Sequence, residues 1–200
     1  MTPGRFITLE GGEGAGKTTQ GALLAAALCA RGRPVLRTRE PGGAPRAEAL
    51  RGFILAHGGW DAQAEMALHV AARREHWAAL IAPALAAGIT VVSDRFHDST
   101  WAYQVAGQGA PAAAFDALHE ALLPDARPHL TVLLDIPPEA GLRRARDPNR
   151  YEALGAAFHR RVHEGFLARA AAEPSRFLCL DARQPREAVA AAILERALAA

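Results

Sequence analysis

Short apolar runs alternate with longer amphipathic segments along this chain of 200 residues. The clearest runs, ITVVS and LTVLLD, lack the polar–apolar alternation of a strand with one face in water, which indicates strands buried on both faces. With three shorter runs they predict strands at residues 6–9, 35–38, 89–93, 130–135 and 177–180. The segments between them predict helices at residues 17–31, 46–56, 62–87, 99–106, 111–122, 138–146, 154–172 and 185–200.

Buried strands that are separated by helices predict an α/β fold, in which a parallel sheet carries helices on both faces. We find no internal repeat and no linker long enough to separate two domains. The chain is therefore expected to form one domain over residues 1–200. A short polar stretch at about residues 144–153 interrupts the helical pattern and is a candidate lid.

Composition excludes several classes of protein. Half of the residues are hydrophobic and the formal net charge is only +2, which gives no general affinity for polyanions such as nucleic acids. Cys29 and Cys179 lie far apart in apolar segments, so we expect buried, reduced thiols rather than a disulfide. The absence of an apolar leader or membrane span favours a cytoplasmic protein with no membrane contact.

Residues 11–18 read GGEGAGKT, which matches the phosphate-binding pattern G-x-x-x-x-G-K-[ST]. A predicted strand precedes this loop and a predicted helix follows it, as the pattern requires. Of the 23 lysines and arginines only Lys17 is a lysine, and it is expected to reach the β- and γ-phosphates of ATP. The Thr18 hydroxyl is expected to bind Mg²⁺. The ATP-binding candidates in this segment are Gly11, Gly12, Glu13, Gly14, Ala15, Gly16, Lys17, Thr18 and Thr19.

The phosphate loop alone does not distinguish a kinase from a GTPase or a motor. Asp94 and Arg95 follow the predicted strand at 89–93, and Arg39 follows the strand at 35–38. Ligands bind at the carboxyl ends of parallel strands, where an aspartate can hold Mg²⁺ and arginines can grip a phosphate. Further arginines surround the polar insert, at Arg143, Arg144, Arg146 and Arg150. Converging arginines are typical of sites that stabilise a phosphoryl group in transfer.

Beyond these single features, the chain resembles bacterial thymidylate kinase over nearly its whole length. The resemblance rests on FITLEGGEGAGKTT, RTREPGG, AARREHW, IAPAL, SDRFHDSTWAYQ, LLDIPPEAGLRRAR and LDARQPREAV, in this order. It implies a P-loop NTP hydrolase fold with a five-stranded parallel sheet and a short lid. It also implies Mg²⁺-dependent transfer from ATP to dTMP, giving dTDP for dTTP biosynthesis, and a homodimer.

The resemblance also implies roles for individual positions. Arg95 would hold the acceptor phosphate with Arg39 nearby, Arg73 would contact thymine, and Tyr103 would crowd the 2′ position of the sugar. The implied substrate-binding set is Glu13, Arg39, Pro41, His69, Arg73, Arg95, Ser99, Thr100, Tyr103 and Gln104. The metal would lie near Glu10, Thr18 and Asp94.

On the ATP side, the resemblance implies that adenine lies against Arg144, Asp181, Ala182, Gln184 and Pro185. The catalytic charges would come from Lys17, Arg95 and lid arginines. Arg150 is the first choice for the lid arginine and Arg146 the second, although only three residues separate them.

One departure from the family pattern leaves the base preference open. The family usually has phenylalanine four residues before Arg73, where it stacks on thymine, and this chain has His69. An imidazole offers less area for stacking and a different charge. A nucleoside monophosphate kinase for dUMP, dCMP or a purine is therefore the nearer alternative. The more distant one is a P-loop ATPase or nucleotide-binding module without an acceptor.

Overall fold

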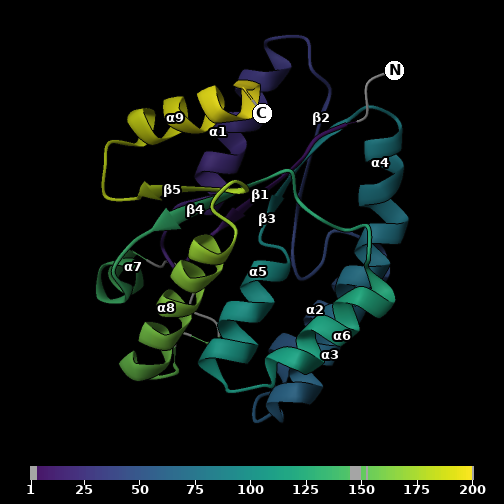
Figure 1. The fold of residues 1–200 in the computed structure, drawn as a ribbon, viewed down its shortest axis with the longest axis vertical. Coiled ribbons are helices and arrows are strands. Elements are labelled where there is room, and N and C mark those ends of the chain that lie inside the picture. Colours follow the sequence, from purple (N-terminus) through teal and green to yellow (C-terminus); the bar gives the residue numbers. More distant parts are fainter. Residues whose placement is uncertain (1–3, 145–149, 152, 200) are drawn as a thin grey trace.

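The computed structural model describes residues 4–144, 150–151 and 153–199. Its centre is one sheet of five parallel strands in the order β2-β3-β1-β4-β5 (Figure 1). The predicted five-stranded parallel sheet is therefore confirmed. The strands are β1 Phe6–Glu10, β2 Val35–Arg39, β3 Thr90–Asp94, β4 Leu130–Asp135 and β5 Phe177–Asp181.

Helices cover both faces of this sheet (Figure 1). Helices α1 Lys17–Cys29 and α9 Arg186–Ala199 pack against each other on one face. Helix α7 Pro138–Arg144 lies beyond the carboxyl end of β4, where its Ala140 packs against the α1–α9 cluster (Figure 1). The remaining helical segments lie on the other side. They are α2 Pro45–Ala56, α3 Ala62–His76, η1 Trp77–Ile81, α4 Ala82–Ala86, α5 His97–Thr100, η2 Trp101–Gly107, α6 Ala112–Leu122 and α8 Ala156–Ala172.

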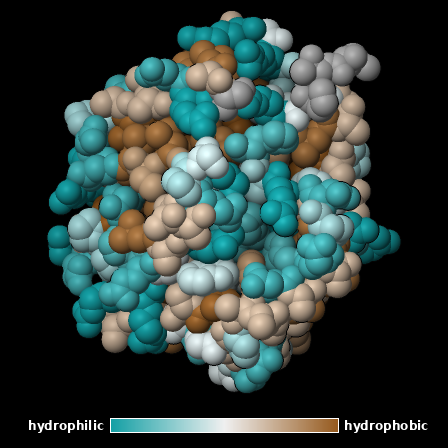
Figure 2. All heavy atoms as spheres, in the orientation of Figure 1, coloured by the Kyte–Doolittle hydropathy of each residue, from teal (hydrophilic) through white to brown (hydrophobic). Residues whose placement is uncertain are grey.

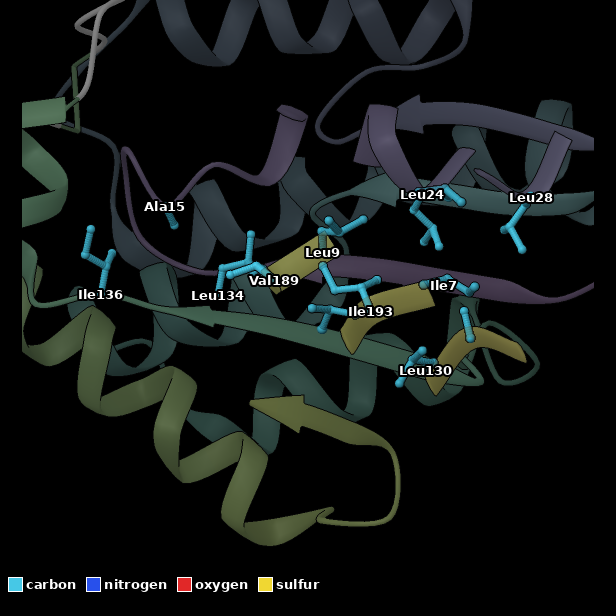
Figure 3. Packing of buried hydrophobic residues seen from close by; sticks show 13 residues of the cluster. Ile7, Leu9, Ala15, Leu24, Leu28, Leu130, Leu134, Ile136, Val189 and Ile193 are labelled. Carbon is cyan, nitrogen blue, oxygen red and sulfur yellow. The ribbon is translucent and has the colours of Figure 1, made fainter. Parts of the chain in front are cut away.

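The two-sided burial explains the continuous apolar runs in the sequence. In β1, Ile7 and Leu9 point toward α1 and α9, whereas Phe6 packs in a separate cluster with Val70 and Phe96 on the opposite face. Figure 3 shows the first of these clusters, in which side chains of the strands interdigitate with side chains of both helices. The labelled members are Ile7, Leu9, Ala15, Leu24, Leu28, Leu130, Leu134, Ile136, Val189 and Ile193.

Two predicted helices contain wider turns than expected. The helix expected at 62–87 runs from Ala62 to Ala86, but its segment Trp77–Ile81 is π-helical. The helix expected at 99–106 begins earlier, at His97, and becomes π-helical over Trp101–Gly107. Such turns are frequent at functional sites, and the second one carries Tyr103 and Gln104.

The prediction of buried cysteines is wrong, because both thiols are exposed. Cys29 is the last residue of α1, and Cys179 lies on β5, which is an edge strand. Both are free, as expected. An apolar neighbourhood in sequence did not reveal that these two positions face away from the core.

On the face seen in Figure 2, hydrophilic side chains predominate, and hydrophobic ones form separate groups among them. Among the described residues, no helix is both long and apolar enough to cross a membrane.

Candidate functional site

The phosphate loop leads from β1 into α1. Its glycines Gly11, Gly14 and Gly16 have φ values of 137°, 67° and 91°, which residues with side chains rarely adopt. A Cβ atom on Gly14 would also lie 2.0 Å from the carbonyl oxygen of Gly141. No side chain caps the N-terminus of α1 at Gly16, so the first N–H groups of the helix are available to an anion.

Lys17 lies folded under this loop. Its Nζ donates to the carbonyl oxygens of Gly11 (3.1 Å) and Gly12 (2.7 Å). Burial, and next the charge of Arg95, lower the pKa of Lys17 to about 8. The partners of Lys17 are thus neutral carbonyl groups, and an anion would bind its ammonium more strongly than they do.

Two side-chain oxygens that could act as metal ligands meet where β3 ends beside α1. The Thr18 hydroxyl donates to Asp94 Oδ2 at 2.6 Å, and both residues line the cleft described below. A hydroxyl and a carboxylate are the hard oxygen ligands that Mg²⁺ prefers, usually completed by water and phosphate oxygens. The pair therefore fits the expected ion, although no group of three or more His, Cys, Asp or Glu side chains in the described part of the chain forms a protein-only metal site.

Glu10 lies behind the cleft rather than in it. Its fully buried carboxylate accepts from the Phe96 N–H (2.7 Å) and the Ser99 hydroxyl (2.5 Å). Burial, followed by the charge of Asp98, raises the pKa of Glu10 to about 8. In this arrangement Glu10 supports the backbone and side chains that follow β3.

Arg95 occupies the centre of the site. Its backbone has φ 71°, which is unusual for a residue with a side chain and indicates a constrained, functional position. Its guanidinium donates to Gly11 O (3.1 Å), Ser99 Oγ (3.1 Å) and Glu13 Oε1 (2.9 Å). The Tyr103 hydroxyl donates to the same Glu13 oxygen at 2.8 Å. Burial alone would raise the pKa of Glu13, but Arg95 and Lys17 outweigh it and lower the pKa to about 2.

Arg73 is held by a buried network at the other end of the site. Its Nε donates to Glu40 Oε2 at 2.7 Å, and its Nη2 donates to Phe96 O (3.1 Å) and Thr100 Oγ1 (2.9 Å). His76 Nδ1 lies 3.0 Å from the second oxygen of Glu40. The peptide bond between Glu40 and Pro41 is cis.

His69 and Tyr151 close the same end of the site. His69 Nε2 lies 3.1 Å from the Tyr151 hydroxyl, which also contacts the carboxylate of Glu65. Burial lowers the pKa of His69, so the ring is neutral at pH 7. Arg150 Nη2 pairs with Glu65 at 2.7 Å. The Arg150 guanidinium thus lies between Glu65 and the Tyr151 ring.

The phosphate loop at Lys17, the surroundings of Arg95 and the end of the site at Arg73 open into one cleft of about 820 Å³, which runs along the carboxyl ends of β1, β2 and β3. On the side of the phosphate loop, the lining contains Gly14, Gly16, Lys17, Thr18, Thr19, Asp94 and Arg144. The predicted acceptor side contributes Glu13, Arg39, Pro41, His69, Arg73, Arg95, Ser99, Thr100, Tyr103 and Gln104. The sequence thus located both halves of the cleft, and the fold brings them together.

A family model described as "Thymidylate kinase" matches residues 9–193 of this chain. The chain belongs to the thymidylate kinase family. Curated thymidylate kinases of Chromohalobacter salexigens and Gluconobacter oxydans are 49% and 50% identical to it, and each alignment covers 96% of this chain and 94% or 93% of the relative. The crystal structure of thymidylate kinase from Ehrlichia chaffeensis superposes with a TM-score of 0.81 at 32% identity, covering 98% of this chain and 100% of that one. The resemblance inferred from the motifs is confirmed.

Several positions implied by the thymidylate kinase resemblance do not line the cleft. Ala182 accepts a hydrogen bond from Arg144 at 3.0 Å, which joins the β5–α9 loop to the cleft wall, and Asp181 pairs with Arg183. Arg146 lies outside the described residues. Predicted positions that are described but absent from the lining are Glu10, Gly11, Gly12, Ala15, Arg150, Asp181, Ala182, Gln184 and Pro185.

Sequence reasoning missed six residues of the lining: Glu40, Arg51, Leu55, Phe96, Tyr151 and Arg186. Glu40 and Phe96 lie inside the quoted TREPGG and DRF motifs, so the motifs themselves contained a signal. Arg186 likewise lies inside the quoted LDARQPREAV segment. Arg51 and Leu55 come from α2, which contains no quoted motif, and only the packing of that helix brings them to the cleft.

Proposed function

We propose that this chain transfers the terminal phosphoryl group of Mg-ATP to dTMP and releases dTDP and ADP. The observation that carries the proposal is the single cleft, which connects the phosphate loop at Lys17 to the arginine-lined acceptor pocket at Arg95 and Arg73. Such a cleft allows donor and acceptor phosphates to approach in line.

On the donor side, the N–H groups of the loop and of the first turn of α1 cradle the phosphates, and Lys17 exchanges its carbonyl partners for phosphate oxygens. Thr18 and Asp94 would hold Mg²⁺, which when bound neutralises charge on the phosphates. Arg144 and the segment from Asp181 to Pro185 would border adenine, since Arg144 already bonds to Ala182.

On the acceptor side, Arg95 grips the monophosphate. In this structure the Arg95 guanidinium pairs with the Glu13 carboxylate. A phosphate dianion would compete with Glu13 for the N–H groups of Arg95. Glu13 then accepts from the 3′-hydroxyl of the sugar, while the Tyr103 ring crowds the 2′ position. Arg73 and Gln104 contact the base. A monophosphate oxygen needs little activation as a nucleophile, so catalysis consists mainly of alignment and charge neutralisation.

The lid arginines complete the proposal. Arg150 would stabilise the transferring group after its ion pair with Glu65 breaks, and Arg146 is the alternative. We also propose, on the family resemblance, that the chain acts as a homodimer in the cytoplasm, where it serves dTTP synthesis. Light scattering coupled to size-exclusion chromatography tests the dimer.

A coupled assay of ADP formation across dTMP, dUMP, dCMP, dGMP and dAMP tests the activity. We expect dTMP to give the highest kcat/KM. The His69 ring, which is neutral and bonded to Tyr151, motivates including the other bases. A preference for another base would favour the alternative kinase, and ATP hydrolysis that no monophosphate accelerates would favour an ATPase.

A further inference from the structure

Glu65 forms an acceptor site beneath the base end of the cleft. Its side chain, on α3, is only 1% exposed. Gln104 Nε2 donates to Oε1 at 2.9 Å, Gln108 Nε2 donates to Oε2 at 3.2 Å, and the Tyr151 hydroxyl and Arg150 both contact Oε1. Burial alone would raise the pKa of Glu65, but hydrogen bonds from His69, Arg150, Tyr151 and Gln108 lower it to about 2. The group is therefore a carboxylate that can only accept hydrogen bonds.

This carboxylate determines how the Gln104 amide is oriented. The Nε2 group must face Glu65, because the reversed amide would place its carbonyl oxygen against a carboxylate oxygen. Gln104 is 1% exposed and lines the cleft. Among the described residues, no side-chain donor contacts its Oε1, yet this oxygen is not sealed from solvent. It therefore opens into the cleft that Gln104 lines.

Arg73 supplies the complementary donor. Its Nε and both N–H groups of Nη2 are used by Glu40, Phe96 and Thr100, and Nη1 lies 3.4 Å from His119. One N–H of Nη1 therefore remains for a ligand in the cleft that Arg73 lines. The base end thus offers an acceptor from Gln104 and a donor from Arg73.

A 4-oxopyrimidine matches this arrangement. Thymine and uracil present a donor at N3 and an acceptor at O4, whereas cytosine presents an acceptor at N3 and a donor at N4. We propose that Glu65 is a positioning residue that holds the Gln104 carbonyl oxygen toward N3 of the base, and thereby makes the enzyme prefer thymine and uracil over cytosine. This inference rests on the proposed function, because it concerns the acceptor nucleotide of that same site.

The test measures kcat/KM for dTMP, dUMP and dCMP in the wild type and in Glu65→Met. Methionine removes the acceptor and leaves the Gln104 amide free to turn. We expect the dTMP-to-dCMP ratio to fall at least about tenfold, the effect of exchanging one good hydrogen bond for a repulsive contact. The dTMP-to-dUMP ratio should not change, since both bases share the N3 and O4 groups. General damage to the fold would instead weaken all three substrates together.

Glu65→Gln is the matched control. Gln104, Tyr151 and Arg150 all meet Oε1, so the amide of the control places its oxygen there. Its nitrogen then faces Gln108, whose Oε1 has no partner and can turn to accept from it. We expect this variant, although it lacks the charge, to keep the wild-type dTMP-to-dCMP ratio. If Glu65→Met does not fold, Glu65→Asp withdraws the carboxylate from Gln104 by one methylene and should lower the ratio in the same way.

A wild-type measurement needs no variant. 3-Methyl-dTMP lacks the N3–H and should be a poorer substrate than dTMP by about tenfold or more. An unchanged dTMP-to-dCMP ratio in a folded Glu65→Met or Glu65→Asp protein overturns the role of Glu65, and equal use of 3-methyl-dTMP overturns the N3 contact. If the wild type shows no preference for dTMP at all, the proposed function itself fails, which is a different result.

Discussion

Arg73→Met tests whether the buried ion pair behind the acceptor pocket carries the stability of that region. The Arg73 and Glu40 side chains are only 2% and 3% exposed, with 2.7 Å between Nε and Oε2. Methionine replaces the guanidinium by an apolar chain and leaves the Glu40 carboxylate with His76 as its remaining partner among the contacts described above. It also removes the donors to Phe96 O and Thr100 Oγ1.

Removing one member of a buried ion pair costs about 3–5 kcal/mol, because the other charge stays buried without compensation. A change of 1 kcal/mol shifts the melting temperature of a chain of this size by about 2–4 °C. We therefore expect Arg73→Met to lower Tm by roughly 6–20 °C. Arg46→Met is the control: its pair with Glu75 spans 3.2 Å, but Arg46 is 86% exposed. That change should cost at most about 1 kcal/mol.

Thermal unfolding followed by circular dichroism, without nucleotide, measures both variants. The pH dependence adds a second check. Burial alone would raise the pKa of Glu40, but Arg73 and His76 lower it by more than burial raises it. The pKa of Glu40 in the folded protein is therefore below the ordinary value. The contribution of the pair is thus complete above the pKa of an unfolded glutamate, about 4, and is lost as the pH falls through the folded pKa. Equal Tm losses for Arg73→Met and Arg46→Met at pH 7 would refute the reasoning.

Three further variants test the donor side. Lys17→Ala should abolish transfer, since Lys17 is the cation of the phosphate loop, and measurable turnover at saturating ATP would contradict the mechanism. If Arg150 leaves Glu65 for ATP, Arg150→Ala should lower kcat by about 10²–10³-fold with little change in KM for dTMP. A change in KM alone would mean that Arg150 acts through the Glu65 cluster and not on ATP. Gly14→Ala should weaken ATP binding in a titration by at least about tenfold, because its Cβ would meet Gly141 O at 2.0 Å at a φ of 67°; unchanged affinity would mean that the loop can shift freely.

Local patterns were sufficient for the strands and for the residues that end them. The apolar continuity of residues 89–93 predicted a strand buried on both faces, as residues 90–93 are, and placed Asp94 and Arg95 at the edge of the sheet where ligands bind. The phosphate loop is equally local, because its glycines, Lys17 and Thr18 act within one turn of backbone. The quoted motifs then supplied the acceptor side.

Contacts between distant segments required the tertiary structure. Glu65, Gln104 and Tyr151 lie on α3, on η2 and just before α8, and nothing in their own neighbourhoods predicts that one carboxylate orients an amide and meets a lid residue. The same cluster pairs Arg150 with Glu65. Elsewhere in the fold, Cys29 at the end of α1 and Cys179 on the edge strand β5 are both exposed. The sequence by itself determined the strand ends and the phosphate loop, because those depend on residues adjacent in the chain. Only the tertiary structure decided which groups complete one another's hydrogen bonds across the cleft, because that depends on how the helices pack.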